Sequence, residues 1–99
     1  MPTKTILKGG TKAKVTFALS ADAEQVAVAG DFNDWSEEAT PLVKRKDGRF
    51  TGTVTVPTGR EYRYRYVIDG ETWENDGEAD WYAPNAHGSE DCVIDLTDD

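Results

Sequence analysis

Cysteine and histidine are almost absent from this chain of 99 residues, which has one of each, Cys92 and His87. A lone cysteine cannot close a disulfide within the chain, and one cysteine with one histidine does not supply the ligand set of a zinc site. The N-terminal sequence MPTKTILKGG lacks the apolar stretch of a signal peptide, and no apolar run approaches the roughly 20 residues that cross a bilayer. We therefore expect a protein of the reducing cytoplasm, without a membrane partner.

Positive charge is missing from the C-terminal part of the chain. Residues 71–99 contain ten Asp and Glu residues and no Lys or Arg, and the whole chain has a formal net charge of −8. An acidic segment of this kind repels the phosphate backbone of nucleic acids and the anionic surface of membranes. The sequence therefore predicts no nucleic-acid binding, and the acidity itself indicates a well-solvated surface.

The many carboxylates do not form a recognisable catalytic or metal site. Glycoside hydrolysis needs two carboxyl groups about 5–10 Å apart in an enclosed site, and no motif builds such an enclosure in so short a chain. Asp76, Glu78 and Asp80 alternate like the start of a calcium-binding loop. Trp81 and His87, however, occupy the positions where that loop needs Gly and Glu. We expect no enzyme activity, no metal and no organic cofactor.

Short alternating segments separated by turn residues cover most of the chain, and helix signals are nearly absent. Strands are predicted at residues 12–19, 25–29, 42–43, 49–56, 61–68, 72–74 and 91–96. The predicted fold class is all-β, an immunoglobulin-like β-sandwich of about seven or eight antiparallel strands. Residues 11–96 form this domain, residues 1–10 a flexible N-terminus and residues 97–99 a C-terminal tail.

The segment EYRYRYVI at residues 61–68 is the clearest strand in the chain. Alternation places its three tyrosines on one face and Arg63 and Arg65 on the other. The tyrosines favour the core for the first face, so the arginines point outward. In the last strand Cys92 shares a face with apolar residues, which predicts a buried thiol. Residues 75–90 are polar and are predicted to be irregular.

The chain has three tryptophans, which is many for its size, and two of them lie in polar turns. Trp35 lies in GDFNDW, and Trp73 follows a DG turn. An indole face fits the apolar C–H face of a glucose ring, and polar side chains around it can bond the hydroxyls. The residues alone leave three interpretations open: sugar binding, indoles packed under their own loops, or a protein interface. Trp81 either packs against its own loop or adds a sugar contact.

Three segments together resemble a known family. VAVAGDFNDWS (26–36), YRYVIDGETWEND (64–76) and PNAHGSEDCVI (84–94) are similar to the glycogen-binding modules of carbohydrate-binding family 48. Such modules occur in the β subunit of AMP-activated kinase and at the N-termini of isoamylases and glycogen-branching enzymes. The resemblance implies non-catalytic binding of α-1,4-glucan, such as glycogen or starch. It also makes a glycogen-metabolising enzyme or a kinase a candidate partner.

The resemblance assigns roles to individual residues. Trp35 and Trp73 match the two tryptophans of the family's stacking platform, although the DGETW spacing is one residue longer than in the kinase modules. Arg65 stands where those modules have a lysine that contacts sugar. Asp91 stands where they have an asparagine that bonds glucose hydroxyls, and His87 falls near a leucine that they insert into the glucan spiral.

Two further polar residues, Asn33 and Glu71, are expected with Asp91 at the rim of the site. The changes at Asp91 and His87 favour an alternative function, because an ionised aspartate only accepts hydrogen bonds and histidine is a poor substitute for leucine. In that alternative the chain is a protein-interaction module that kept the sandwich and lost sugar binding.

Overall fold

The computed structural model describes residues 3–77, 79–86 and 88–97, which form nine β-strands and no helix. The strands are β1 (Thr3–Ile6), β2 (Lys12–Ser20), β3 (Val26–Gly30), β4 (Val43–Lys44), β5 (Arg49–Pro57), β6 (Glu61–Ile68), β7 (Thr72–Glu74), β8 (Trp81–Pro84) and β9 (Glu90–Asp95). Within those ranges there is accordingly no helix that could cross a membrane.

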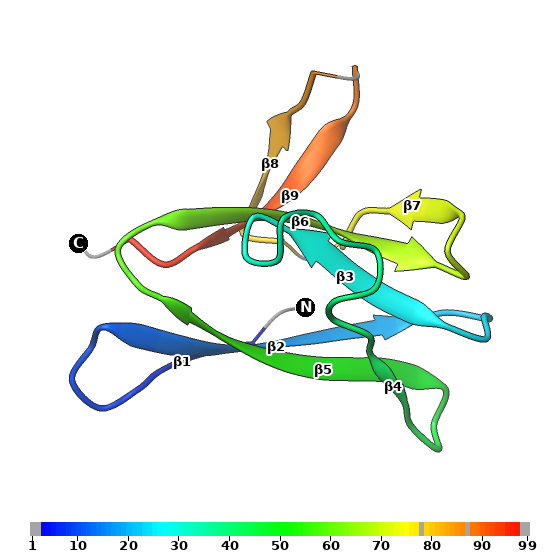
Figure 1. The fold of residues 1–99 in the computed structure, drawn as a ribbon, viewed down its shortest axis with the longest axis horizontal. Coiled ribbons are helices and arrows are strands. Elements are labelled where there is room, and N and C mark those ends of the chain that lie inside the picture. The colour runs from blue at the N-terminus through cyan, green and yellow to red at the C-terminus, as the bar shows by residue number, and fades with distance from the viewer. Residues whose placement is uncertain (1–2, 78, 87, 98–99) are drawn as a thin grey trace.

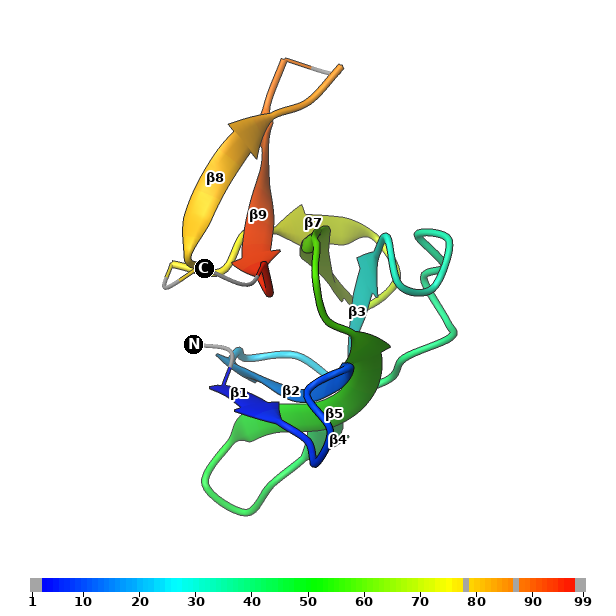
Figure 2. The same ribbon diagram turned by 90° about the vertical axis from the view of Figure 1, so that its left-hand side faces the viewer.

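Two antiparallel sheets form the layers of the molecule (Figure 1). The first sheet has the strand order β1-β2-β5-β4, and the second has the order β3-β6-β9-β8, with β7 paired to β6 beside this path. Figure 2 shows the β8–β9 hairpin extending away from the two layers. The predicted all-β sandwich is confirmed, with nine strands in place of seven or eight.

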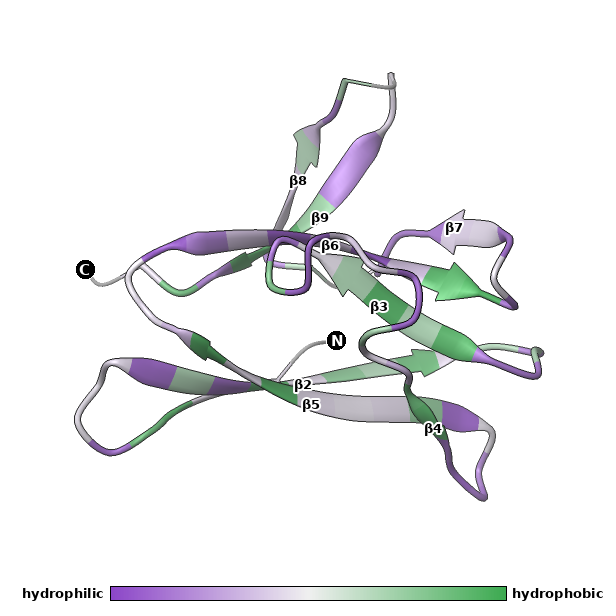
Figure 3. Ribbon diagram, in the orientation of Figure 1, coloured by the Kyte–Doolittle hydropathy of each residue, from purple (hydrophilic) through white to green (hydrophobic). Residues whose placement is uncertain are grey.

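Alternation along the long strands builds the core between the sheets. In β2 the side chains of Ala13, Val15 and Phe17 are fully buried, and the three tyrosines of β6 are at most 3% exposed, as predicted. Figure 3 shows hydrophobic and hydrophilic residues succeeding one another along these strands. Burial of each large apolar side chain contributes about 1.5–3 kcal/mol to folding, so this face of β6 anchors the second sheet.

A polar cluster lies within the apolar core. Asp76 is 3% exposed, and its Oδ2 accepts hydrogen bonds from the hydroxyls of Tyr64 (3.0 Å) and Tyr66 (3.1 Å). The backbone N–H of Asp76 donates to the sulfur of Cys92 at 3.0 Å. Burial raises the pKa of both tyrosines and raises the pKa of the Cys92 thiol to about 11, so these groups keep their protons at neutral pH. The predicted burial of Cys92 is confirmed.

Two segments form strands where the sequence predicts none. Residues 75–90 are predicted to be irregular, yet Trp81–Pro84 forms β8 and pairs with β9. Residues 1–10 are predicted to be flexible, yet Thr3–Ile6 forms β1 and pairs with β2. All four residues of β1 are exposed, so this strand lacks the buried face from which a strand is normally predicted. Of the predicted tail, residues 98–99 lie outside the described residues.

Candidate functional site

Gly30 determines where the loop that carries Trp35 leaves the second sheet. A side chain at Gly30 would drive its Cβ into the backbone carbonyl oxygen of Arg63 on β6, an atom that cannot move aside. Only glycine therefore allows β3 to lie this close to β6 at the point where the strand ends. This contact explains the glycine of the GDFNDW segment.

Asn33 holds the same loop closed. Its Oδ1 accepts a hydrogen bond from the N–H of Gly30 at 3.0 Å, and its Nδ2 donates to Val28 O and to Thr40 Oγ1, each at 2.9 Å. Both hydrogens of the amide are thereby used within the protein. The sequence predicts Asn33 at the rim of a sugar site, but the structure gives its side chain the role of a brace inside the loop.

The tip of this loop carries backbone strain. Asp34 and Trp35 have φ angles of 57° and 58°, in the left-handed region that a bulky residue seldom adopts. Strain of this kind costs on the order of 1–3 kcal/mol and clusters at functional sites. The indole Nε1 of Trp35 donates to Asp31 Oδ1 at 3.0 Å, which fixes the orientation of the half-buried ring.

Trp73 meets Trp35 from a separate part of the chain. It lies on β7 opposite Val67 of β6 and is also half-buried. The two indole rings have their centroids 6.5 Å apart and their planes inclined by 31°. The loop after β3 and the strand β7 therefore combine two tryptophans into one tilted aromatic surface.

Arg65 supports the strand that carries Trp73. Its Nε donates to Asn75 Oδ1 at 2.8 Å, and its Nη2 donates to the backbone oxygen of Trp73 at 3.4 Å. Both partners are uncharged, and no ion pair joins Arg65 to a carboxylate within the described part of the chain. Arg65 thus holds a guanidinium beside the aromatic surface while helping to position it.

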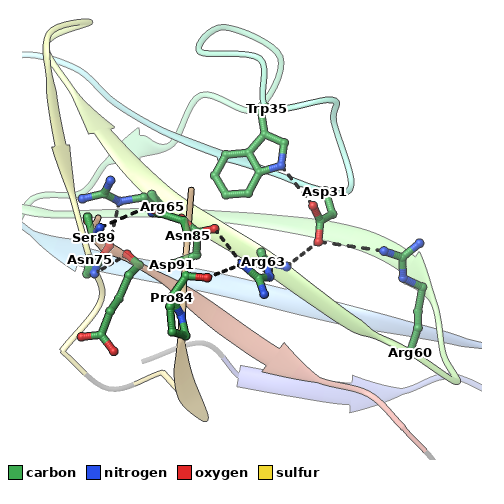
Figure 4. A network of polar contacts seen from close by, with 11 residues as sticks. Asp31, Trp35, Arg60, Arg63, Arg65, Asn75, Pro84, Asn85, Ser89 and Asp91 are labelled. Carbon is green, nitrogen blue, oxygen red and sulfur yellow. Dashed lines mark hydrogen bonds and ion pairs between the residues drawn. The ribbon is translucent and has the colours of Figure 1, made fainter. Parts of the chain in front are cut away.

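A second arginine, Arg63, links β6 to the β8–β9 hairpin (Figure 4). Its Nη1 donates to Pro84 O at 3.1 Å and forms an ion pair with Asp91 Oδ2 at 3.4 Å. Asp91 is 7% exposed and also accepts a hydrogen bond at Oδ1 from Asn85 Nδ2, at 3.0 Å. The backbone N–H of Arg63 donates to Asp31 Oδ2 at 2.8 Å. This network joins the loop of Trp35 to both strands of the hairpin.

These side chains surround a hollow of about 570 Å³, which we call the aromatic hollow. Its lining is Asp31, Trp35, Arg63, Arg65, Trp73, Pro84, Asn85, Ala86 and Asp91. Two aspartates and two arginines face it, so their formal charges cancel although the whole protein has a net charge of −8. The volume lies in the range of about 300–1,000 Å³ that is usual for small-molecule sites.

The aromatic hollow contains most of the residues that the sequence singles out. Trp35, Trp73, Arg65 and Asp91 line it, whereas the exposed Glu71 is not part of its lining. Sequence reasoning missed three polar residues of the lining, which are Asp31, Arg63 and Asn85. Arg63 shares an alternating strand face with Arg65, and this pattern could have identified it.

Two sequence features remain: the calcium-like triplet, which the sequence does not favour as a metal site, and His87, which falls near the family's leucine. Glu78, the middle residue of the calcium-like triplet, and His87 both lie outside the described residues. Among the residues that are described, no group of three or more His, Cys, Asp or Glu side chains is arranged to hold a metal ion.

Comparison with known proteins relates this chain to a family and to an enzyme. The family model for the glycogen recognition site of AMP-activated protein kinase matches residues 13–99. The 1,4-alpha-glucan branching enzyme GlgB of Aquifex aeolicus (strain VF5) is 42% identical over 45 residues, which cover 42% of this chain and 7% of that enzyme. The chain therefore spans only a small part of the length of this relative.

Proposed function

Because this chain belongs to the family of the glycogen recognition site of AMP-activated protein kinase, a family of carbohydrate-binding modules rather than enzymes, we propose that it binds α-1,4-linked glucan in the aromatic hollow. The ligand is glycogen, starch or a malto-oligosaccharide, held without covalent chemistry. Trp35 and Trp73 stack on glucose rings, and Arg65 donates hydrogen bonds to their hydroxyls.

One observation carries this proposal: the tilted tryptophan pair shares its hollow with balanced charges. A glucose ring has an apolar C–H face that packs on an indole, and an α-1,4 chain coils, so successive rings present inclined faces. The angle of 31° between the indoles suits such a chain better than a flat one. A hollow without excess charge suits a neutral ligand.

The polar lining also matches the chemistry of sugar hydroxyls, which both donate and accept hydrogen bonds. Arg63 and Arg65 supply donors, and Asp31 and Asp91 supply acceptors. Asp91 already accepts from Arg63 and Asn85 at its two oxygens, so it offers a sugar only the acceptor capacity that remains. We therefore assign Asp91 chiefly to holding the arginine in place.

The cellular setting is a further part of the proposal. A branching enzyme carries a segment similar to this chain within a much longer protein. This similarity supports the proposal that the chain acts beside a glycogen-metabolising enzyme or a kinase and brings it to the polysaccharide. We place this activity in the cytoplasm, a reducing compartment that suits a chain whose one cysteine is a free thiol.

Malto-oligosaccharides will change the tryptophan fluorescence of the protein, and cello-oligosaccharides of similar length will not, because their β-1,4 chains are flat. The site is open on one side, so we expect weak affinity, on the order of micromolar to millimolar. Fluorescence titration with maltoheptaose and cellohexaose measures this difference. A spectrum that stays constant at millimolar maltoheptaose would overturn the proposal and favour the protein-interaction alternative.

Replacing Arg65 by alanine will weaken maltoheptaose binding by roughly ten- to a hundredfold. A hydrogen bond from a charged group contributes about 1.5–3 kcal/mol, and each 1.4 kcal/mol is about tenfold in affinity. Arg65→Lys will recover part of the lost affinity, because lysine keeps the positive charge. The recovery will be incomplete, because lysine lacks the planar donor group of arginine. Isothermal titration calorimetry at one salt concentration measures both.

Arg49→Ala is the matched control for the Arg65 variants. Arg49 is an exposed arginine on β5 of the first sheet, paired with Asp47 at 2.9 Å, so its loss should leave binding unchanged. If Arg65→Ala and Arg65→Lys also bind maltoheptaose like the unmodified protein, Arg65 has no part in recognition.

A further inference from the structure

Trp81 is an exposed aromatic residue outside the aromatic hollow. It lies on β8 and leaves 44% of its surface exposed. Its neighbour Tyr82 is also exposed, but the Tyr82 hydroxyl donates to Asp76 O at 2.6 Å, which anchors that side chain on the inner side of the strand. Successive side chains of a strand point to opposite faces, so Trp81 faces outward.

Strand register places Trp81 on the same outer face as the hollow. Trp81 is paired with Val93 of β9, and Val93 is paired with Arg63 of β6, so the three residues form one row across the second sheet. Neighbouring strands are about 4.8 Å apart, which puts the backbone of Trp81 roughly 10 Å from that of Arg63. Arg63 itself lines the aromatic hollow.

The row meets the hollow at Arg63. The guanidinium of Arg63 reaches across β9 to Pro84 O, at 3.1 Å, and so joins β6 to β8, the strand that begins with Trp81 (Figure 4). A ligand that leaves the tryptophan pair on this side meets a hydrogen-bond donor first and an exposed indole next. The aromatic hollow likewise combines arginine donors with indole rings.

We propose that Trp81 is a third stacking position, which binds α-glucan chains long enough to extend from the aromatic hollow across Arg63. Its ligand is the apolar C–H face of a glucose ring distant from those held by Trp35 and Trp73. This inference rests on the proposed function, and it adds a preference for longer chains over short ones. The competing role of Trp81 is to cover Val93, which is only 2% exposed.

The variant Trp81→Leu separates these two roles, because leucine still covers Val93 but has no flat ring. We expect its affinity for maltoheptaose to fall by about tenfold, equivalent to about 1.4 kcal/mol, and its affinity for maltotriose to stay unchanged. Thermal unfolding should match that of the unmodified protein. Val43→Thr, at a residue of β4 that is 56% exposed in the first sheet, is the control and should change neither affinity.

A measurement on the unmodified protein complements the variant. The indole N–H resonance of Trp81, assigned through the variant or through Trp81→Phe, should shift with maltoheptaose and stay in place with maltotriose. The inference about Trp81 is overturned, and the proposed function is not, if the unmodified protein binds both sugars, Trp81→Leu leaves the ratio of the two affinities unchanged, and the Trp81 resonance does not shift. Equal weakening for both sugars would also overturn it. Failure of the unmodified protein to bind either sugar would instead contradict the proposed function itself.

Discussion

Replacing Trp35 or Trp73 by alanine will lower the affinity for malto-oligosaccharides by roughly thirtyfold or more while the protein stays folded. Truncation of an aromatic hot-spot residue at the centre of a binding surface weakens the binding free energy by about 2 kcal/mol or more. A change of about 1.4 kcal/mol corresponds to a factor of ten in affinity. Each ring lies 6.5 Å from the other, so either truncation leaves the sugar with half of the aromatic surface. Calorimetric titration of each variant measures the loss.

The stability of the same variants distinguishes a binding surface from a core. Both indoles are half-buried and outside the core cluster, so we expect the free energy of unfolding to change by about 1 kcal/mol or less. Trp35→Phe and Trp73→Phe, which keep a smaller flat ring, should retain part of the affinity. If the alanine variants unfold, or if they bind sugar like the unmodified protein, the tryptophans do not act as a stacking surface.

Tyr64→Ala will have the opposite effect and will destabilise the protein by about 3–5 kcal/mol, as deletion of a large buried aromatic side chain does. Tyr64 is fully buried and makes edge contacts with Phe17 and Tyr66, at centroid distances of 5.0 Å and 5.9 Å. Its removal leaves a cavity and takes one hydrogen-bond donor from the buried Asp76. Urea denaturation followed by circular dichroism measures the change.

Tyr64→Phe isolates the contribution of the hydroxyl. The ring stays in place, so the loss should be limited to the bond with the Asp76 carboxylate, about 1.5–3 kcal/mol. The folded fraction of both Tyr64 variants should still bind maltoheptaose, because Tyr64 faces away from the aromatic hollow. A loss below about 1 kcal/mol for Tyr64→Ala would show that this side chain is not part of a tightly packed core.

The sequence predicts the long strands because one physical pattern governs them. In β2, β5 and most of β6 a residue that faces the core alternates with an outward one, and Gly or Asp-Gly turns flank several of these strands. Val67 of β6 departs from the alternation, because it is 2% exposed on the face of Arg63 and Arg65. The strands β1 and β8 lack that pattern, since β1 is wholly exposed and the adjacent Trp81 and Tyr82 of β8 are both exposed. Each pairs with the next strand of the chain in a hairpin, and this backbone pairing leaves no alternation of buried and exposed residues in the strand itself.

The site could be predicted in part for a similar reason. The two tryptophans and Arg65 lie in the segments that carry the family resemblance, so the sequence itself points to them. Asn33 lies in the same motif, but no sequence pattern tells whether a loop side chain turns outward to a ligand or inward to backbone groups, as it does here. The ion pair of Arg63 with Asp91 depends on the pairing of β6 with β9.

Titration of the isotopically labelled protein with maltoheptaose, followed residue by residue by NMR, tests the proposed glucan site most directly. We predict that shifts concentrate on Trp35, Trp73 and Arg65, and extend over the outer face of the second sheet. The outer face of the first sheet, where Thr16 and Thr53 bond each other at 3.0 Å, should be unaffected. Shifts gathered on the first sheet, or none at millimolar sugar, would contradict glucan binding in the aromatic hollow.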